Sequence, residues 1–160
     1  MNREEIIHFF VDDHQKLENV LSKLTSKEIF HEKVQGDWTV KDIIAHISAW
    51  NWELIKQTDL VLSWKKPWYT DLPEADFNKK AVKKRESWSL EKVLSEWRDS
   101  FNALVTRMST LSQEEWTFEL DDEAWPEGGK VTVASIFGYR YNEEGHEGGH
   151  AKVIQRYFDI

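Results

Sequence analysis

Four segments of this sequence carry apolar residues at intervals of three and four positions, the spacing that puts them on one face of an α-helix. The segments cover residues 2–24, 40–60 and 89–108 and the stretch that follows Thr132. Thr39, Ser89 and Thr132 stand where the last three begin, and Ser and Thr are favoured helix N-caps. Four such helices leave no room for a sheet in 160 residues, so the sequence predicts an all-α bundle in a single domain, residues 1–160.

The last of these segments contains the run His146-Glu147-Gly148-Gly149-His150. Two histidines four positions apart lie on one face of a helix, where their ring nitrogens can share a metal ion. The spacing also matches the H-E-x-x-H motif of zinc proteases, with Glu147 as the general base. Only ten residues follow His150, and none suits the third ligand that such a protease needs. The third ligand must therefore come from upstream, and His46 is the best candidate.

The polar residues of this last segment fall on its apolar face. With roughly 100° between residues on an ideal helix, the apolar stripe consists of Ile136, Tyr139, Val153, Ile154 and Tyr157. Glu143, His146 and His150 fall inside the stripe, and Glu147 falls at its edge. Buried polar groups are costly unless they are paired or bind metal, so this face predicts a site in which Glu143 or Glu147 moves a proton. The alternative is a loop with exposed histidines.

Three glycines, Gly145, Gly148 and Gly149, occupy the same two turns. Each glycine costs about 1 kcal/mol relative to alanine inside a helix. A segment that accepts this cost has a reason for it, and we expect either a close approach of another backbone or a binding site.

His46 lies among apolar residues of the second segment, between Ile44 and Ile47. A single histidine on an apolar face is more often a hydrogen-bonded core residue than a ligand, but the pair in the last segment needs a partner from another helix. Three neutral imidazoles suit Zn, Ni or Fe(II) and leave coordination positions open. His8, His14 and His31 are expected at the surface, with His14 as the only spare ligand among them.

The connection over residues 63–88 is long for a helical bundle and rich in aromatic residues, as is the whole chain, which has nine tryptophans. Long connections of this kind are functional covers or disordered segments, and the aromatic content favours packing. We expect it to fold over the metal-binding end and form part of a small-molecule pocket. The candidate pocket residues are Trp50, Trp64, Trp68, Tyr69 and Tyr139. The alternative is that the rings of the connection cover the outside of the third helix.

Charge and composition exclude several classes of function and of binding site. The net charge of −8 argues against nucleic-acid binding, and we interpret the local cluster Lys79–Arg85 as a solvated face. There are no cysteines, which excludes disulfides, thiolate metal sites and cysteine nucleophiles. No apolar run is long enough to span a membrane, and the first residues lack the apolar core of a signal peptide, so a cytoplasmic location is expected. The oligomeric state, a homodimer included, stays open.

The pattern Trp38-Thr39-Val40-Lys41-Asp42-Ile43-Ile44-Ala45-His46-Ile47-Ser48-Ala49-Trp50 resembles the second helix of the DinB-like superfamily, and it is closest to the ClbS/DfsB branch. Further similar pieces follow in the family's order: Leu72-Pro73 with Asp76-Phe77-Asn78, then Ser89 to Leu94, then Leu111-Ser112-Gln113-Glu114-Glu115. No single piece is specific, but their order along most of the chain is.

The resemblance implies an up-down-down-up four-helix bundle with a long connection between helices 2 and 3. Many members of the superfamily bind a divalent metal through one histidine of the second helix and an H-x-x-x-H pair on the fourth, which would correspond to His46, His146 and His150. Some relatives are thiol-dependent transferases or isomerases, and ClbS-type relatives protect the cell from a DNA-alkylating metabolite. The glycine-rich last helix departs from the family pattern.

Three functions remain as hypotheses. The first is a metal-dependent hydrolase or transferase that acts on a small electrophile in detoxification or self-protection, with metal-activated water as the nucleophile. The second is a non-catalytic protein that binds and sequesters a small toxic compound through its tryptophans. The third, a zincin-type protease, is the least favoured because the motif lacks its third ligand. The sequence specifies neither the substrate nor the metal.

Overall fold

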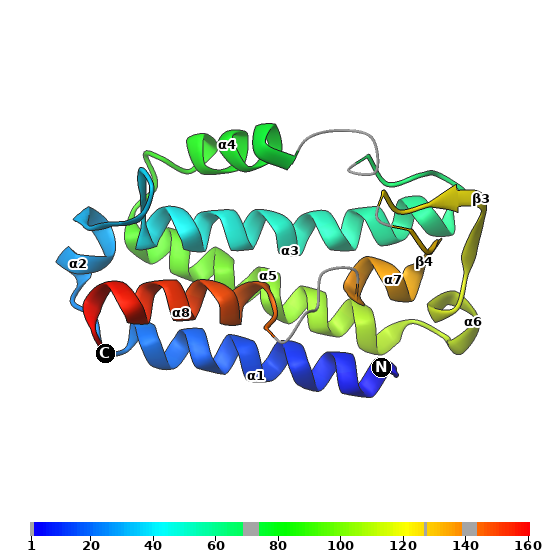
Figure 1. Cartoon of the computed structure of the whole chain (residues 1–160), viewed down its shortest axis with the longest axis horizontal. Coiled ribbons are helices and arrows are strands. Elements are labelled where there is room, and N and C mark those ends of the chain that lie inside the picture. The colour runs from blue at the N-terminus through cyan, green and yellow to red at the C-terminus, as the bar shows by residue number, and fades with distance from the viewer. Residues whose placement is uncertain (1, 69–73, 127, 139–143) are drawn as a thin grey trace.

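The computed structural model describes residues 2–68, 74–126, 128–138 and 144–160. In these residues the long elements are the helices α1 (Arg3–Leu21), α3 (Val40–Leu62), α5 (Leu90–Thr110) and α8 (His146–Phe158). They pack against one another, with α1 and α8 running in one direction and α3 and α5 in the other (Figure 1). The predicted all-α bundle is confirmed.

The helix starts follow from local side-chain chemistry. The Thr39 hydroxyl accepts a hydrogen bond from the Asp42 N–H, and the Asp42 carboxylate accepts one from the Thr39 N–H, so a capping box with Asp in the usual Glu position begins α3. Ser89 accepts from the Lys92 N–H at the start of α5. Both predicted caps are therefore present.

The prediction that Thr132 caps the final long helix is wrong. Thr132 precedes a short helix, α7 (Val133–Gly138), and its hydroxyl accepts from the Ser135 N–H. A separate helix, α8, begins at His146, and Gly145 before it supplies no side-chain cap. The low helix propensity of glycine is consistent with a helix start directly after Gly145.

Short elements connect the long helices. They are α2 (Ser26–His31), α4 (Glu74–Lys84), α6 (Gln113–Trp116) and two antiparallel hairpins, β1 (Lys33–Gln35) with β2 (Trp38–Thr39) and β3 (Glu119–Ala124) with β4 (Lys130–Thr132). The expectation of no strand at all is thus wrong in detail, because turns between helices pair briefly as hairpins. None of the helices in the described ranges is long and apolar enough to cross a membrane.

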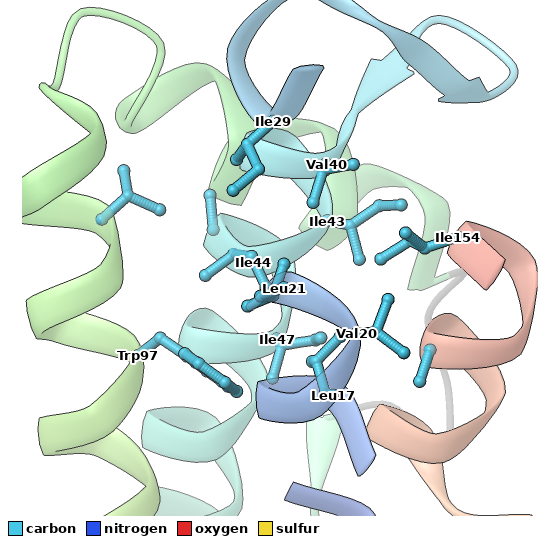
Figure 2. Close-up of a cluster of buried hydrophobic side chains, with 13 residues drawn as sticks. Leu17, Val20, Leu21, Ile29, Val40, Ile43, Ile44, Ile47, Trp97 and Ile154 are labelled. Atoms are coloured by element: carbon cyan, nitrogen blue, oxygen red, sulfur yellow. The ribbon is translucent and has the colours of Figure 1, made fainter. Parts of the chain in front are cut away.

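The buried apolar residues form two clusters. Figure 2 shows one of them, in which the labelled side chains come from α1, α2, the start of α3, α5 and α8: Leu17, Val20, Leu21, Ile29, Val40, Ile43, Ile44, Ile47, Trp97 and Ile154. The other cluster includes Ile6, Val61, Leu104, Met108 and Phe137.

Buried polar residues lie between the two clusters along the helices. Asp13 is near the middle of α1, Asn51 is in the middle of α3 and Ser100 is in the middle of α5, while Glu147 is in the first turn of α8. Asn51 Nδ2 donates to Ser100 Oγ over 3.2 Å. We call these four residues the polar layer.

The connection over residues 63–88 is partly helical, because it contains α4, which packs along α3 (Figure 1). Trp68 attaches the segment before α4 to α3. Its indole Nε1 donates to Glu53 Oε1 over 2.6 Å, and its backbone N–H donates to Gln57 Oε1 over 3.3 Å. Glu53 and Gln57 are themselves buried, and buried polar groups need hydrogen-bond partners. Trp68 therefore supplies partners to two buried side chains of α3.

Candidate metal centre

Three histidines from two helices meet beside α3. His46 lies in the second turn of α3 and is only 5% exposed, while His146 and His150 lie in the first two turns of α8. The Nε2 atoms of His46 and His146 are 2.8 Å apart, and one ligand atom from each of the three rings lies within 4.8 Å of the others. Among the described residues, the predicted ligands are thus brought to one point.

The hairpin before α3 supports two of these rings. His150 Nδ1 is 3.2 Å from Gln35 Oε1 of β1, a contact that leaves its Nε2 available for a metal. The Trp38 ring of β2 packs on His46 with its centroid 5.0 Å away. Nδ1 of His46 is buried without a hydrogen-bond partner in the described part of the chain.

The environment keeps at least two of the imidazoles neutral. Burial lowers the pKa of His46 to about 3, with a further lowering from the charge of His150 and a partly opposing effect of the Asn78 side chain. Burial also lowers the pKa of His150 to about 4. The neutral imidazole is the form that binds a metal ion, so both rings are ready to bind at neutral pH.

The donor set fits a divalent metal ion. With metal–nitrogen bonds of about 2.0–2.1 Å, neighbouring ligand nitrogens lie roughly 3 Å apart. The closest pair, on His46 and His146, is already near this separation, and a small inward movement would bring the widest pair, which is within 4.8 Å, to the same ion. Three nitrogen ligands suit Zn, Ni or Fe(II). The side chain of His146 is exposed and all three histidines line a pocket, so a bound ion would stay accessible to a further ligand.

A pocket of about 430 Å³ opens over the three histidines. Its apolar wall includes Trp38, Trp50 and Phe137, and its polar lining includes Glu74 and Asn78 of α4. Trp50 Nε1 donates to Asn78 Oδ1 over 2.8 Å, which fixes the indole in the wall. The pocket combines a candidate metal-binding site with an aromatic surface, the lining that is typical of small-molecule sites.

Glu147 does not line this pocket. Glu147 belongs to the polar layer and is only 6% exposed. Its Oε2 is 2.8 Å from His14 Nδ1, and its Oε1 accepts a hydrogen bond from Trp97 Nε1 over 3.0 Å. Successive residues on a helix point roughly 100° apart, so the carboxylate turns toward α1 and α5 while His146 faces α3. This placement argues against the predicted role of Glu147 as a general base.

The family of the chain follows from a comparison with known proteins. Residues 10–151 match the family model of the DinB superfamily. The chain belongs to the DinB superfamily. No curated protein sequence matches it.

Two solved structures share the DinB fold seen here. A mycothiol-dependent maleylpyruvate isomerase superposes with a TM-score of 0.76 at 16% identity, covering 96% of this chain, which spans 61% of that protein. The colibactin self-resistance protein ClbS, solved in complex with a dsDNA, superposes with a TM-score of 0.76 at 13% identity, covering 99% of this chain and 96% of that one. At these identities the likeness shows the fold alone.

Within this DinB fold, only part of the predicted pocket wall is found at the pocket. Trp50 lines it, whereas Trp64 is 64% exposed and packs its ring on Phe118 at a centroid distance of 4.8 Å. Trp68 is also absent from the lining and lies behind Trp50, with ring centroids 6.0 Å apart. Trp68 does not reach the pocket because its indole N–H is bonded to Glu53. The connection contributes to the pocket wall through Glu74 and Asn78 of α4 instead. Tyr69, Tyr139 and Glu143 lie outside the described residues.

Sequence reasoning misplaced one residue of α1 beside the candidate metal centre, His14, and missed another, Asp13. The prediction that His14 is a surface residue is wrong, because its ring stacks on Phe101 with centroids 3.7 Å apart. Asp13 is 3% exposed and accepts from the Gly148 N–H over 3.2 Å and from Lys16 Nζ over 2.8 Å. A signal for Asp13 exists in the sequence, since it stands in the apolar stripe of α1, four positions before Leu17.

Proposed function

We propose that this chain is a metal-dependent enzyme that acts on a small electrophilic compound, as a hydrolase or transferase in detoxification or self-protection. One observation carries the proposal: three imidazoles converge where an exposed ring, His146, faces an aromatic pocket of about 430 Å³. The names of the two structural neighbours are consistent with it, because one protein depends on a thiol and the other confers resistance.

The residues divide into ligands, wall and proton acceptors. His46, His146 and His150 would hold the ion, which when bound supplies a Lewis acid that activates a nucleophile or polarises the substrate. Trp50 and the other aromatic wall residues would orient the organic part of the substrate and exclude water. Glu74 and Glu144 are the carboxylates of the described pocket lining, and Glu144 is paired with Lys152. They are candidate proton acceptors beside Glu143, whose predicted role remains a prediction.

Metal content tests the proposal directly. The protein should be purified without a nickel column, loaded separately with Zn, Ni or Fe(II), and analysed by mass spectrometry for bound metal. We expect one equivalent per chain, lost in His46→Ala and kept in His31→Ala, a control histidine that is exposed. A wild-type chain that retains none of the three metals after gel filtration rules out the proposal.

A non-catalytic sequestering protein is the second candidate. The placement of Glu147 away from the pocket favours it, because the motif then brings no base to the ligand. The two candidates differ in what happens to a bound electrophile, which a sequestering protein returns unchanged after denaturation. Mass spectrometry of the released compound distinguishes them.

The ligand class, location and assembly of the protein are also proposals. The same placement of Glu147 removes the main support for a zincin protease. The net charge of −8 argues against nucleic acid as the ligand of this chain, although ClbS was solved with a dsDNA. A cytoplasmic location and a homodimer remain predictions.

A further inference from the structure

The first turn of α8 is held by α1. The N-cap residue Gly145 offers no side chain, and Asp13 of α1 accepts a hydrogen bond from the N–H of Gly148, the third residue of α8. A side-chain oxygen on this N–H is what an N-cap residue normally supplies. The positive end of the helix dipole also favours a carboxylate there. Asp13 therefore caps α8 from a neighbouring helix.

The next residue of α1 makes a second connection to the same turn. His14 Nδ1 is 2.8 Å from Glu147 Oε2, and the His14 ring lies against Phe101 of α5 with an interplanar angle of 8°. Trp97 of α5 donates to the other carboxylate oxygen over 3.0 Å. We call Asp13, His14, Trp97 and Glu147 the α8 clasp. It fixes both the position and the rotation of the turn that carries His146.

Rotation of this turn matters for a metal ligand. A side-chain atom at the outer radius of a helix, about 5–6 Å from the axis, moves by about 1 Å when the helix turns by roughly 10°. Metal–ligand distances tolerate deviations of only about 0.2 Å. Glu147 stands directly after one ligand, His146, and three residues before the other, His150, so its two hydrogen bonds set the angle at which both face His46.

We propose that the α8 clasp positions the metal ligands, so that Asp13, His14 and Glu147 control metal affinity without touching the metal. The glutamate of the H-E-x-x-H run is then a positioning residue and not the base. The inference rests on the proposed metal site. Gly148 fits the same account, because a Cβ on it would lie 2.6 Å from an oxygen of Asp13 and would push α1 away from α8.

The test compares metal affinity in paired variants. Asp13→Ala and Glu147→Ala should weaken Zn affinity, measured by chelator competition, by about 10- to 100-fold, the usual effect of removing a partner that orients a ligand. Asp13→Asn and Glu147→Gln should stay within about threefold of wild type, because the amide oxygen still accepts from Gly148 or Trp97. A glutamine NH₂ can also donate to His14 Nδ1 in its other tautomer.

Cobalt(II) gives a second measurement that a purely structural role would not change. The visible absorption of the bound ion should shift in the alanine variants and match wild type in the amide variants. The control is Val131→Ala, a buried apolar substitution in the other cluster, chosen to lower stability without reaching α8. If Glu147→Ala does not fold, Trp97→Phe and His14→Phe each remove one hydrogen-bond partner of the carboxylate while keeping an aromatic ring at the position.

The outcomes separate this inference from the proposed function. Clasp variants that bind metal as wild type does would overturn the inference alone. So would an equal loss of affinity in Val131→Ala, because the effect would then come from general destabilisation. A wild-type chain that binds no metal overturns the proposed function and, with it, the inference.

Discussion

Neighbouring residues of α8 differ because their surroundings differ. Gly148 faces the carboxylate of Asp13, whereas a Cβ on Gly149 would meet nothing within 4 Å. The glycine that the fold requires and the one that it merely tolerates are thus adjacent in sequence. Composition alone cannot separate them, because both cost the helix the same propensity.

Alanine at these two positions should change stability in opposite directions. Gly148→Ala should destabilise the protein by about 1–3 kcal/mol, the usual cost of overpacking. Gly149→Ala should stabilise it by up to about 1 kcal/mol through helix propensity. Urea unfolding of the two variants measures both effects. Equal stability of Gly148→Ala and wild type would mean that α1 can move away from α8 without cost.

Histidine burial predicts a loss of stability in acid for the metal-free protein. The pKa of His46 is about 3 in the folded state, below the unfolded value of 6.5, so only the unfolded chain takes up this proton between those values. The unfolding free energy is therefore unaffected by this proton above pH 6.5, and it decreases as the pH falls from 6.5 toward 3. At pH 5 the loss from His46 is about 2 kcal/mol.

Urea unfolding in EDTA at pH 7 and pH 5 checks this. The decrease in unfolding free energy between the two should be smaller in His46→Gln than in wild type. The exposed His8→Gln serves as a control and should leave the decrease unchanged. The same dependence in His46→Gln as in wild type would contradict the burial of this imidazole.

At the scale of elements, α3 is the organising helix. It provides His46 to the metal centre, Trp50 to the pocket wall, and Glu53 with Gln57 to the connection. Gln57 Nε2 and Trp68 Nε1 both donate to Glu53 Oε1 over 2.6 Å. A buried carboxylate needs such donors, so Trp68 stabilises the packing of the connection on α3.

Replacement of Trp68 should therefore reduce stability. Trp68→Phe removes the donor to Glu53, and a buried acceptor left with fewer partners costs about 1–3 kcal/mol. Trp64→Phe, at a mostly exposed ring, should change the unfolding free energy by less than about 0.5 kcal/mol. Thermal unfolding compares the two. If ligand binding falls in Trp68→Phe while its melting temperature stays at the wild-type value, the ring acts as a pocket wall, which was the original prediction.

At the scale of the whole molecule, a bound ion would connect α3 to α8. The helix α3 belongs to the pair that runs in one direction and α8 to the pair that runs in the other (Figure 1). Metal–ligand bonds to both helices would therefore join the two pairs. A ligand that binds only the folded state stabilises it by RT ln(1 + [L]/Kd), so the gain in unfolding free energy grows with the logarithm of the free ligand concentration. The stability of this protein should thus depend on free metal.

Zinc at 100 times its Kd should raise the unfolding free energy by about 2.7 kcal/mol. The melting temperature of wild type should rise accordingly and return on addition of EDTA. His46→Ala should show no rise, because one of the three ligands is gone. A rise of equal size in His46→Ala would place the stabilising zinc at another site.

The sequence by itself determined the helical class, the starts of two long helices and the spacing of the candidate ligands. Apolar periodicity and the caps at Thr39 and Ser89 are local, because an N-cap hydrogen bond joins residues three apart. The interval between His146 and His150 is equally local, since one helical turn brings them to the same face. The place of His46 was inferred through the family resemblance and the need for a third ligand.

Only the tertiary structure decided which way the remaining polar groups face. Glu147 lies at the edge of a stripe, and the packing of α1 and α5 turned it into the polar layer and away from the pocket. Asp13 caps a helix that starts 133 residues later in the chain, at His146, and no local rule predicts such a pairing. The indole N–H of Trp68 donates to Glu53, a buried carboxylate that needs donors. In each case the orientation depends on groups that are distant in sequence, and they become neighbours only when the helices pack.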